Sequence, residues 1–296
     1  MKVFSLSGII TRVIHRPEKK QSPAEPSRHA RRAFQKQKNS VSVSFIILIG
    51  TIVFLFLPLF VTIAYSFNES KGFEFTQFSF TWYKALLFDS DDLWRSVKNS
   101  LIVAFSAGAL ATVLGTAAAI GIRWFKFWGK TYIQALTFLP MVLPDVIIGV
   151  SMLIFFAGIK LPLSLLTIFI AHATFCLPFV FLMILARIDE FDYSIVEASY
   201  DLGANERQAM FKVIIPAIMP AVVSAFLMAV TISLEDFVIT FFVAGPGSTT
   251  LPLYVYSMIR FGVSPVINAL SCVIVIGTIL IAFILRKFLK SFAASK

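Results

Sequence analysis

The sequence predicts an all-α polytopic membrane protein with six transmembrane helices, and three observations support this prediction. Of its 296 residues, 58% are hydrophobic and only 14% are charged, whereas a soluble domain carries about a quarter charged residues. Apolar segments recur that are long enough to cross a bilayer, which takes roughly 20 residues. The basic residues are unevenly distributed along the chain. The composition excludes a disordered chain, a disulfide-rich secreted module and a typical cytosolic enzyme.

Residues 1–40 form a basic, proline-containing tail. They hold ten of the 26 Lys and Arg residues and two of the 16 Asp and Glu residues, a net of +8, so the rest of the chain carries only +2 of the total of +10. Such a tail beside an apolar segment predicts a flexible cytoplasmic anchor that faces anionic lipid. It does not predict a nucleic-acid partner, because the basic residues do not extend into the body of the chain.

Six segments are long and apolar enough to span. They are expected at about residues 41–66, 97–122, 131–157, 163–186, 213–243 and 268–289. Proline interrupts the third segment at Pro140 and Pro144, and the fifth at Pro216 and Pro220. Because proline removes a backbone donor, kinked or broken helices are expected at these places.

The orientation follows from the loops. With the N-terminus inside, the inner segments hold 20 of the 26 basic residues, so the positive-inside rule places both termini in the cytoplasm. The transmembrane domain is expected over 41–290, with a cytoplasmic tail at 291–296. Long polar loops are expected outside at 68–96 and 244–267, and inside at 187–212. Loops of this length in a small helical bundle are often functional.

The inner loop carries a spaced motif. An amphipathic stretch ends at Gly203, which suits a left-handed helix cap, and a second helical piece leads to Pro216. Glu197-Ala198-Ser199 is followed by three residues, Gly203, nine residues and then Val213-Ile214-Ile215-Pro216. An ordinary amphipathic interfacial helix is the alternative interpretation.

This spacing resembles the EAA loop of the permease subunits of ABC importers, which have the MetI-like fold. Ser199, Val213 and Ile215 are conservative departures from that pattern. The resemblance implies that the loop at about 187–216 is a coupling helix that docks on a cytoplasmic ATPase. The implied coupling residues are Glu197, Ala198, Ser199, Gly203 and Pro216.

Three acidic residues lie within apolar runs. A carboxylate in the hydrocarbon region is costly and usually faces a partner or a wet pathway. At about 1.5 Å per helical residue, Asp145 lies roughly 22 Å above the inner Lys130 and Glu235 roughly 32 Å above Ile214. Asp145, Glu235 and Asp236 are therefore candidate residues of a cation pathway, or acids wetted at helix ends. Neighbours on a helix diverge by about 100°, so at most one of the adjacent pair points straight into a pathway.

Other polar and aromatic side chains have simpler interpretations. His172 is expected to be a hydrogen-bonded packing residue, and Cys176 and Cys272 to be small buried hydrophobes. Trp82, Tyr83 and Trp94 are expected to anchor the outer interface. Tyr254 and Tyr256 suit either an interface or the aromatic wall of a site for a cationic amine, and both are included among the candidate pathway residues.

The resemblance narrows further, to PotC-type permeases of spermidine/putrescine ABC importers, over roughly residues 41–290. It rests on stretches such as Leu143-Pro144-Asp145, His172–Val180, Phe242–Pro246, Leu251–Met258 and Gly262–Pro265 with Asn268-Ala269-Leu270. The resemblance implies half of a polyamine pathway, with both termini on the inner side of a bacterial cytoplasmic membrane. The implied partners are a second homologous permease, two ATPase subunits and an extracytoplasmic binding protein.

The sequence contains no Gly-x-x-x-x-Gly-Lys-[Ser/Thr] motif, so ATP and Mg²⁺ are expected on the partner ATPase, with no cofactor and no bond chemistry in this chain. The alternatives are a permease of the same fold for an opine, ferric iron, thiamine or sulfate, and an ion-coupled secondary transporter. A membrane enzyme is disfavoured, because the three His residues have no metal-ligand spacing.

Overall fold

The computed structural model describes residues 43–72, 74–261 and 265–294, so the predicted basic tail at residues 1–40 lies outside the described residues. The chain divides into two units, Met1–Phe60 and Val61–Lys296. The described part of the first unit is the beginning of helix α2 (Val43–Tyr65), a continuous apolar helix. The account below concerns the second unit.

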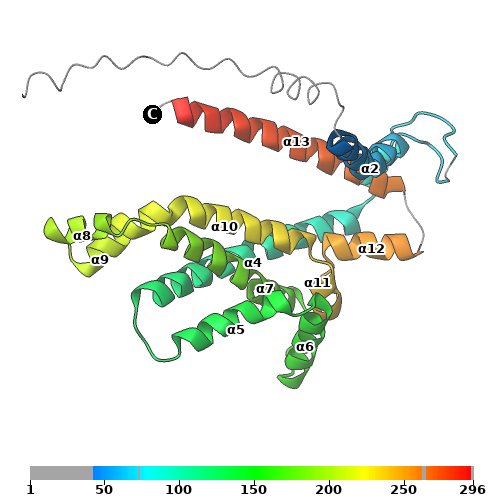
Figure 1. Cartoon of the computed structure of the whole chain (residues 1–296). Helices are drawn as coiled ribbons and strands as arrows, with labels where there is room; N and C mark the ends of the chain where they lie inside the picture. The colour runs from blue at the N-terminus through cyan, green and yellow to red at the C-terminus, as the bar shows by residue number, and fades with distance from the viewer. Residues whose placement is uncertain (1–42, 73, 262–264, 295–296) are drawn as a thin grey trace, which may run out of the picture. The chain divides into compact units, whose positions relative to one another are not determined.

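Every long element of the second unit is a helix (Figure 1). After α2 the helices are α3 (Thr81–Phe88), α4 (Asp91–Trp124), α5 (Lys130–Val142), α6 (Asp145–Gly158), α7 (Leu165–Asp189), α8 (Ser194–Asp201), α9 (Glu206–Ala209), the π-turn η3 (Met210–Ile214), α10 (Ile215–Glu235), α11 (Val238–Val243), α12 (Leu251–Phe261) and α13 (Pro265–Ala294). The all-α membrane fold predicted from composition is thus confirmed.

Helices α4, α7 and α10 lie side by side and form the core (Figure 1). Small residues on α4 let the three backbones approach closely, as in other membrane helix pairs. A Cβ atom on Gly115 would lie 2.7 Å from Val180 Cγ1 and 3.1 Å from the backbone nitrogen of Phe181, both on α7. One on Gly108 would lie 3.0 Å from Val230 Cγ2 on α10. These glycines therefore set the spacing of the core helices.

Two of the predicted spans are broken helices. The segment predicted at 131–157 consists of α5 and α6, which are bent by 111° at Leu143 and Pro144. The break predicted there is confirmed, and the straight-helix depth of Asp145 no longer applies because Asp145 begins the second arm. The segment predicted at 213–243 ends earlier than expected, at Glu235, and α11 follows as a separate short helix.

Of the prolines predicted to interrupt the spans, Pro144 lies at the α5–α6 bend, whereas Pro140 lies inside α5 without ending it. Pro220 lies inside α10 without ending it. Just before Pro216, the π-turn Met210–Ile214 widens the helix. A proline ring clashes with the carbonyl four residues earlier in a regular helix, and a π-turn is a common way to relieve that conflict.

Four helices are long and apolar enough to cross a membrane, or five if the bent α5–α6 pair counts as one span. The last predicted span, 268–289, falls on α13, of which Pro265–Leu280 is recorded as a shorter apolar helix within the described residues. The predicted positions therefore match helices, while the count of six stays a prediction.

The aromatic side chains predicted to anchor the outer interface each have a protein partner. Trp82 Nε1 donates to the Asn68 carbonyl at 2.7 Å, and Trp94 Nε1 to the Leu86 carbonyl at 2.8 Å. The hydroxyl oxygens of Tyr83 and Ser66 are 2.7 Å apart. These bonds hold the loop together, and Trp82 and Tyr83 also pack against a buried cluster that includes Leu86. Both cysteines are buried and free, as expected.

Candidate functional site

The loop predicted to lie on the inner side forms a knob at one end of the α4–α7–α10 core (Figure 1). Its own small core joins Phe191, Val196, Ala209 and Ile214. Gly203 has φ of +82°, the left-handed conformation that the sequence predicts for the residue ending the first helical piece. The helix–glycine–helix layout expected of residues 187–216 is therefore present.

A side-chain cap fixes the start of α9, and a local side-chain bond lies just before α8. Asn205 Oδ1 accepts from the Gln208 backbone nitrogen, and Gln208 Oε1 accepts from the Asn205 backbone nitrogen, both at 2.9 Å. This capping box was not predicted, although its Asn-x-x-Gln spacing is readable in the sequence. At the start of α8, the Ser194 backbone N–H donates to Asp192 Oδ1 at 2.9 Å, which lowers the pKa of that carboxyl. Asp192 therefore stays ionised at a helix N-terminus, where a negative charge is stabilising.

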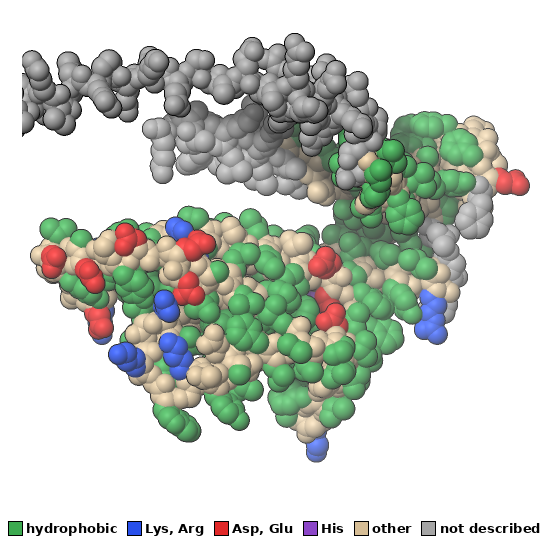
Figure 2. Space-filling view, viewed as in Figure 1, with side chains coloured by type: hydrophobic (Ala, Val, Ile, Leu, Met, Phe, Trp, Pro, Cys, Tyr) green, Lys and Arg blue, Asp and Glu red, His purple; other side chains and the backbone are tan. Residues whose placement is uncertain are grey.

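The knob exposes both apolar and acidic side chains. Leu202 is 89% exposed, and Ile195 and Phe211 are also exposed. Acidic side chains gather over α8 and α9 (Figure 2). Among the implied coupling residues, Glu197, Ala198, Gly203 and Pro216 are exposed, while Ser199 is half-buried and donates to the Val196 carbonyl at 2.7 Å. Exposed apolar side chains rimmed by charges are typical of a protein-docking surface.

A side chain of α4 joins the knob to the helical core. Trp124, the last residue of α4, packs against both the central core and the small core of the knob. Its ring lies 5.7 Å from the ring of Tyr193. Beside it, Arg123 Nε lies 3.2 Å from Asp189 Oδ1 at the end of α7. The knob is thus attached to α4 and α7 as well as to α10.

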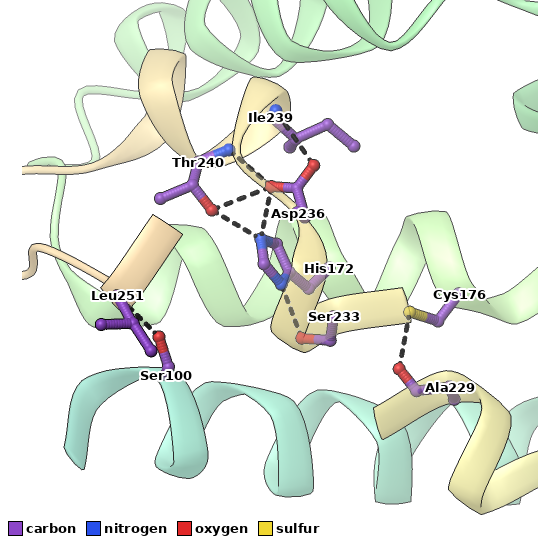
Figure 3. Close-up of polar contacts among 9 residues, drawn as sticks. All are labelled: Ser100, His172, Cys176, Ala229, Ser233, Asp236, Ile239, Thr240 and Leu251. Atoms are coloured by element: carbon purple, nitrogen blue, oxygen red, sulfur yellow. Dashed lines mark hydrogen bonds and ion pairs between the residues drawn. The ribbon is translucent and has the colours of Figure 1, made fainter. Parts of the chain in front are cut away.

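The second candidate site is the break between α10 and α11. Here the two neighbouring acids have opposite surroundings, since Glu235 is exposed and Asp236 is 9% exposed. Asp236 Oδ1 accepts from the Ile239 backbone nitrogen at 3.2 Å, and Oδ2 accepts from the Thr240 backbone nitrogen at 2.9 Å. The Asp236 carboxylate therefore caps the first turn of α11 and does not face open space (Figure 3).

Asp236 also belongs to a buried polar network that includes His172 of α7 (Figure 3). His172 Nε2 lies 3.1 Å from Asp236 Oδ2 and 2.9 Å from Thr240 Oγ1, and Nδ1 lies 2.7 Å from Ser233 Oγ. The packing role expected for His172 is confirmed. Its partners could not be predicted, because they are 61 and more residues away in the sequence.

Three aromatic rings lie beside the same break. The Phe237 ring centroid lies 4.5 Å from that of Tyr256 and 5.7 Å from that of Phe241. Tyr256, a predicted pathway residue, is thus brought next to the Glu235–Asp236 pair. Phe237 and Phe241 were not predicted, because one phenylalanine among the 32 of this chain carries no distinguishing signal.

Asp145 and Tyr254 occupy different places from Tyr256. Asp145 is exposed at the start of α6, one turn before Gly149, whose added Cβ would lie 2.7 Å from Phe242 Cδ2 of α11. Tyr254 instead lines a polar cavity of about 370 Å³ between α4 and α12, together with Asp92 and Arg95. The α10–α11 break therefore gathers Glu235, Asp236 and Tyr256, while Tyr254 faces a separate cavity.

No metal site is evident in the part of the chain that the structure describes. There, no group of three or more His, Cys, Asp and Glu side chains is placed to hold a metal ion. The two candidate sites instead have the features of a docking surface and of a polar element inside an apolar bundle. These features are those of an apolar helical bundle that carries a structured surface loop at one end.

Comparison with known proteins identifies the family. Residues 111–290 match the model of the binding-protein-dependent transport system inner membrane component. The chain belongs to this family, and it is a permease component of an ABC importer.

Two curated relatives and one solved structure are similar over most of the chain. The spermidine/putrescine transport system permease protein PotC of Haemophilus influenzae is 37% identical over 224 residues, which cover 75% of this chain and 87% of that protein. The putrescine transport system permease protein PotI of Escherichia coli K12 is 40% identical over 247 residues, covering 81% and 88%. A chain of a bacterial ABC transporter involved in alginate import aligns over 92% of this chain and 100% of its own length, with a TM-score of 0.63 and 16% identity. This last match supports the fold alone.

Proposed function

We propose that this chain is a polyamine permease subunit that forms half of the transmembrane pathway for spermidine or putrescine. The observation that carries the proposal is the identity of 37% and 40% to two polyamine permeases over at least three quarters of the chain. The α10–α11 break adds a physical reason. An exposed carboxylate beside aromatic rings suits an alkylammonium group, which is attracted by negative charge and by ring faces.

The proposed assembly has a second homologous permease, two ATPase subunits that bind ATP and Mg²⁺, and an extracytoplasmic binding protein. Both termini lie in the cytoplasm, which places the knob of α8 and α9 against the ATPase. The exposed Leu202 and Phe211 and the helix cap at Gly203 support this role.

In the proposed cycle, ATP binding closes the ATPase pair and moves the knob. Trp124 and the continuous chain through η3 transmit this movement to α4 and α10, which opens the bundle toward the outside. Polyamine leaves the binding protein and passes the carboxylates of Asp145 and Glu235, and ATP hydrolysis then resets the helices. This chain performs no bond chemistry itself.

The test is ATP hydrolysis by the complete complex, measured with the loaded binding protein for a panel of solutes. Spermidine or putrescine should stimulate hydrolysis, whereas sulfate and thiamine should leave it at the basal rate. Stimulation by one of the other solutes and by neither polyamine would contradict the proposed substrate, while the assignment to the permease family would stand.

A further inference from the structure

We infer that His172 is a positioning residue of the transport pathway, which holds the α10–α11 break in one geometry. In that geometry Asp236 turns into the protein, while Glu235 and the rings of Phe237 and Tyr256 stay on its exposed side. The effect on uptake rests on the proposed function, whereas the effect on the break itself does not.

His172 connects three helices from a single buried position. The side chain starts on α7 and is 1% exposed. One ring nitrogen reaches Ser233 in the last turn of α10, and the other reaches Asp236 in the break and Thr240 in α11 (Figure 3). The ring therefore spans the interruption between α10 and α11.

The number of protons that each of these side chains can donate fixes the direction of the hydrogen bonds. Thr240 Oγ1 donates its one proton to Asp236 Oδ2 at 2.9 Å. His172 Nε2 then faces only acceptors, so it carries a proton and donates. In the neutral ring, Nδ1 accepts from the Ser233 hydroxyl. Every polar atom of the His172 ring thus has a partner.

The Asp236 carboxylate depends on this arrangement. A buried carboxylate is stable only while enough donors satisfy its oxygens, and the loss of one donor leaves it poorly satisfied. Two backbone N–H groups of α11, one hydroxyl and the imidazole donate to Asp236. Without the imidazole, the most direct relief is for Asp236 to turn toward water, which would unwind the first turn of α11.

Such a rotation of Asp236 would alter the exposed side of the break. Glu235 precedes Asp236, and Phe237 follows it with its ring 4.5 Å from Tyr256. Because the backbone joins these three residues, Glu235 and Phe237 must also move when Asp236 leaves its bonds to the α11 backbone. A change at His172 should therefore reach the pathway surface although His172 itself is buried.

Two substitutions of His172 separate its two ring nitrogens. In His172→Gln, the amide nitrogen can take the place of Nε2 and still donate to Asp236. In His172→Asn, the shorter amide takes the place of Nδ1 and reaches Ser233 only. The pair Thr240→Val and Thr231→Val gives a matched control, because Thr240 Oγ1 donates to Asp236, whereas the exposed Thr231 Oγ1 donates to the Leu227 carbonyl of its own helix.

The experiment uses the full complex in vesicles and measures two quantities, the KM for polyamine uptake and the hydrogen exchange of backbone amides over residues 236–243. We expect His172→Asn and Thr240→Val to raise KM roughly tenfold, as for loss of a hydrogen bond to a charged group, and to speed exchange. His172→Gln should stay close to the wild type, and Thr231→Val should match it in both quantities.

Unchanged KM and unchanged exchange in His172→Asn and Thr240→Val would overturn the inference. A raised KM without faster exchange would also overturn it, since His172 would then act on the solute and not on the break. Should the His172 variants fail to assemble, Thr240→Val against Thr231→Val decides. If the wild-type complex takes up no polyamine, the proposed substrate fails, and the exchange data still test the positioning role.

Discussion

At the residue scale, the backbone conformation of Gly203 sets the shape of the knob that we propose to dock on the ATPase. Its φ of +82° ends α8 and turns the chain toward α9 at the tip of the knob. Glycine and asparagine adopt this conformation readily, whereas β-branched residues do not. No heavy atom beyond its immediate surroundings would touch a Cβ on Gly203, so the conformation and not crowding is the constraint.

We predict that Gly203→Val leaves membrane insertion intact and lowers solute-stimulated ATP hydrolysis of the full complex by roughly fivefold or more. The reason is backbone strain of about 1–3 kcal/mol, which the loop relieves by changing the shape of the knob. Gly203→Asn is the matched variant and should retain most of the stimulation. Equal hydrolysis in the wild type and Gly203→Val would show that the knob does not couple to the ATPase.

The exposed acids are the second test at this scale. Asp145→Asn and Glu235→Gln should each raise the KM for polyamine uptake roughly two- to fivefold without loss of assembly, because each removes an exposed negative charge from the proposed path of a cation. Asp89→Asn, an equal change of charge at an exposed residue of the loop between α3 and α4, is the control. If both pathway variants transport polyamine as well as Asp89→Asn does, the two acids are structural.

The sequence was informative about residue type and less so about partners. It predicted that His172 packs through hydrogen bonds, because a lone histidine in an apolar helix needs buried partners. It grouped Glu235 with Asp236 and left open which of them faces a pathway. The structure separates the two, since Asp236 caps α11 and contacts His172 across 64 residues. Spacing along one helix carries no information about such distant contacts.

At the element scale, the two helix breaks have different causes. The bend between α5 and α6 coincides with Pro144 and was predictable, because proline disfavours a helical conformation in the residue before it. The break after α10 contains no proline. It is stabilised by the Asp236 cap and the His172 network. Hydropathy does not detect such a break, and the span was therefore predicted to run without interruption from 213 to 243. Pro220, in contrast, lies inside a continuous helix.

The close packing of α4 against α7 gives a prediction about stability. Gly115→Ala should lower the thermal stability of the detergent-solubilised protein, at a cost of about 1–3 kcal/mol, because the new methyl would meet the Val180 side chain and the Phe181 backbone. Gly121→Ala, on the same helix, is the control, since a Cβ there meets nothing within 4 Å. A melting temperature of Gly115→Ala no lower than that of Gly121→Ala would refute this packing.

The link between the knob and α4 gives a prediction about coupling. Trp124→Ala removes the ring that packs on both the knob and the central core, so the amount of solute imported per ATP hydrolysed should fall several-fold. Trp128→Ala is the matched control, because that ring lies four residues further on and is fully exposed. The measurement is uptake and hydrolysis in the same vesicles. An unchanged ratio in Trp124→Ala would mean that force reaches the bundle by another route.

At the scale of the whole molecule, composition was sufficient for the class and motif spacing for the family. A chain with 58% hydrophobic and 14% charged residues is suited to a bilayer, and the Glu197–Gly203–Pro216 spacing led to an importer permease, which the family match over residues 111–290 confirms. The number of spanning helices and the residues that line the pathway were harder to predict from the sequence. Both depend on breaks and on contacts between distant segments, which a single sequence does not encode in a local pattern.

The central claim is that this permease imports polyamine at the expense of ATP hydrolysed by a separate subunit. Its most direct test is uptake of labelled spermidine and putrescine into vesicles that hold the complete complex, with and without ATP and the ATPase subunits. The account predicts accumulation of at least one polyamine that requires both ATP and the ATPase and is absent for labelled sulfate. Polyamine uptake that persists without the ATPase, or uptake of sulfate in place of polyamine, would contradict it.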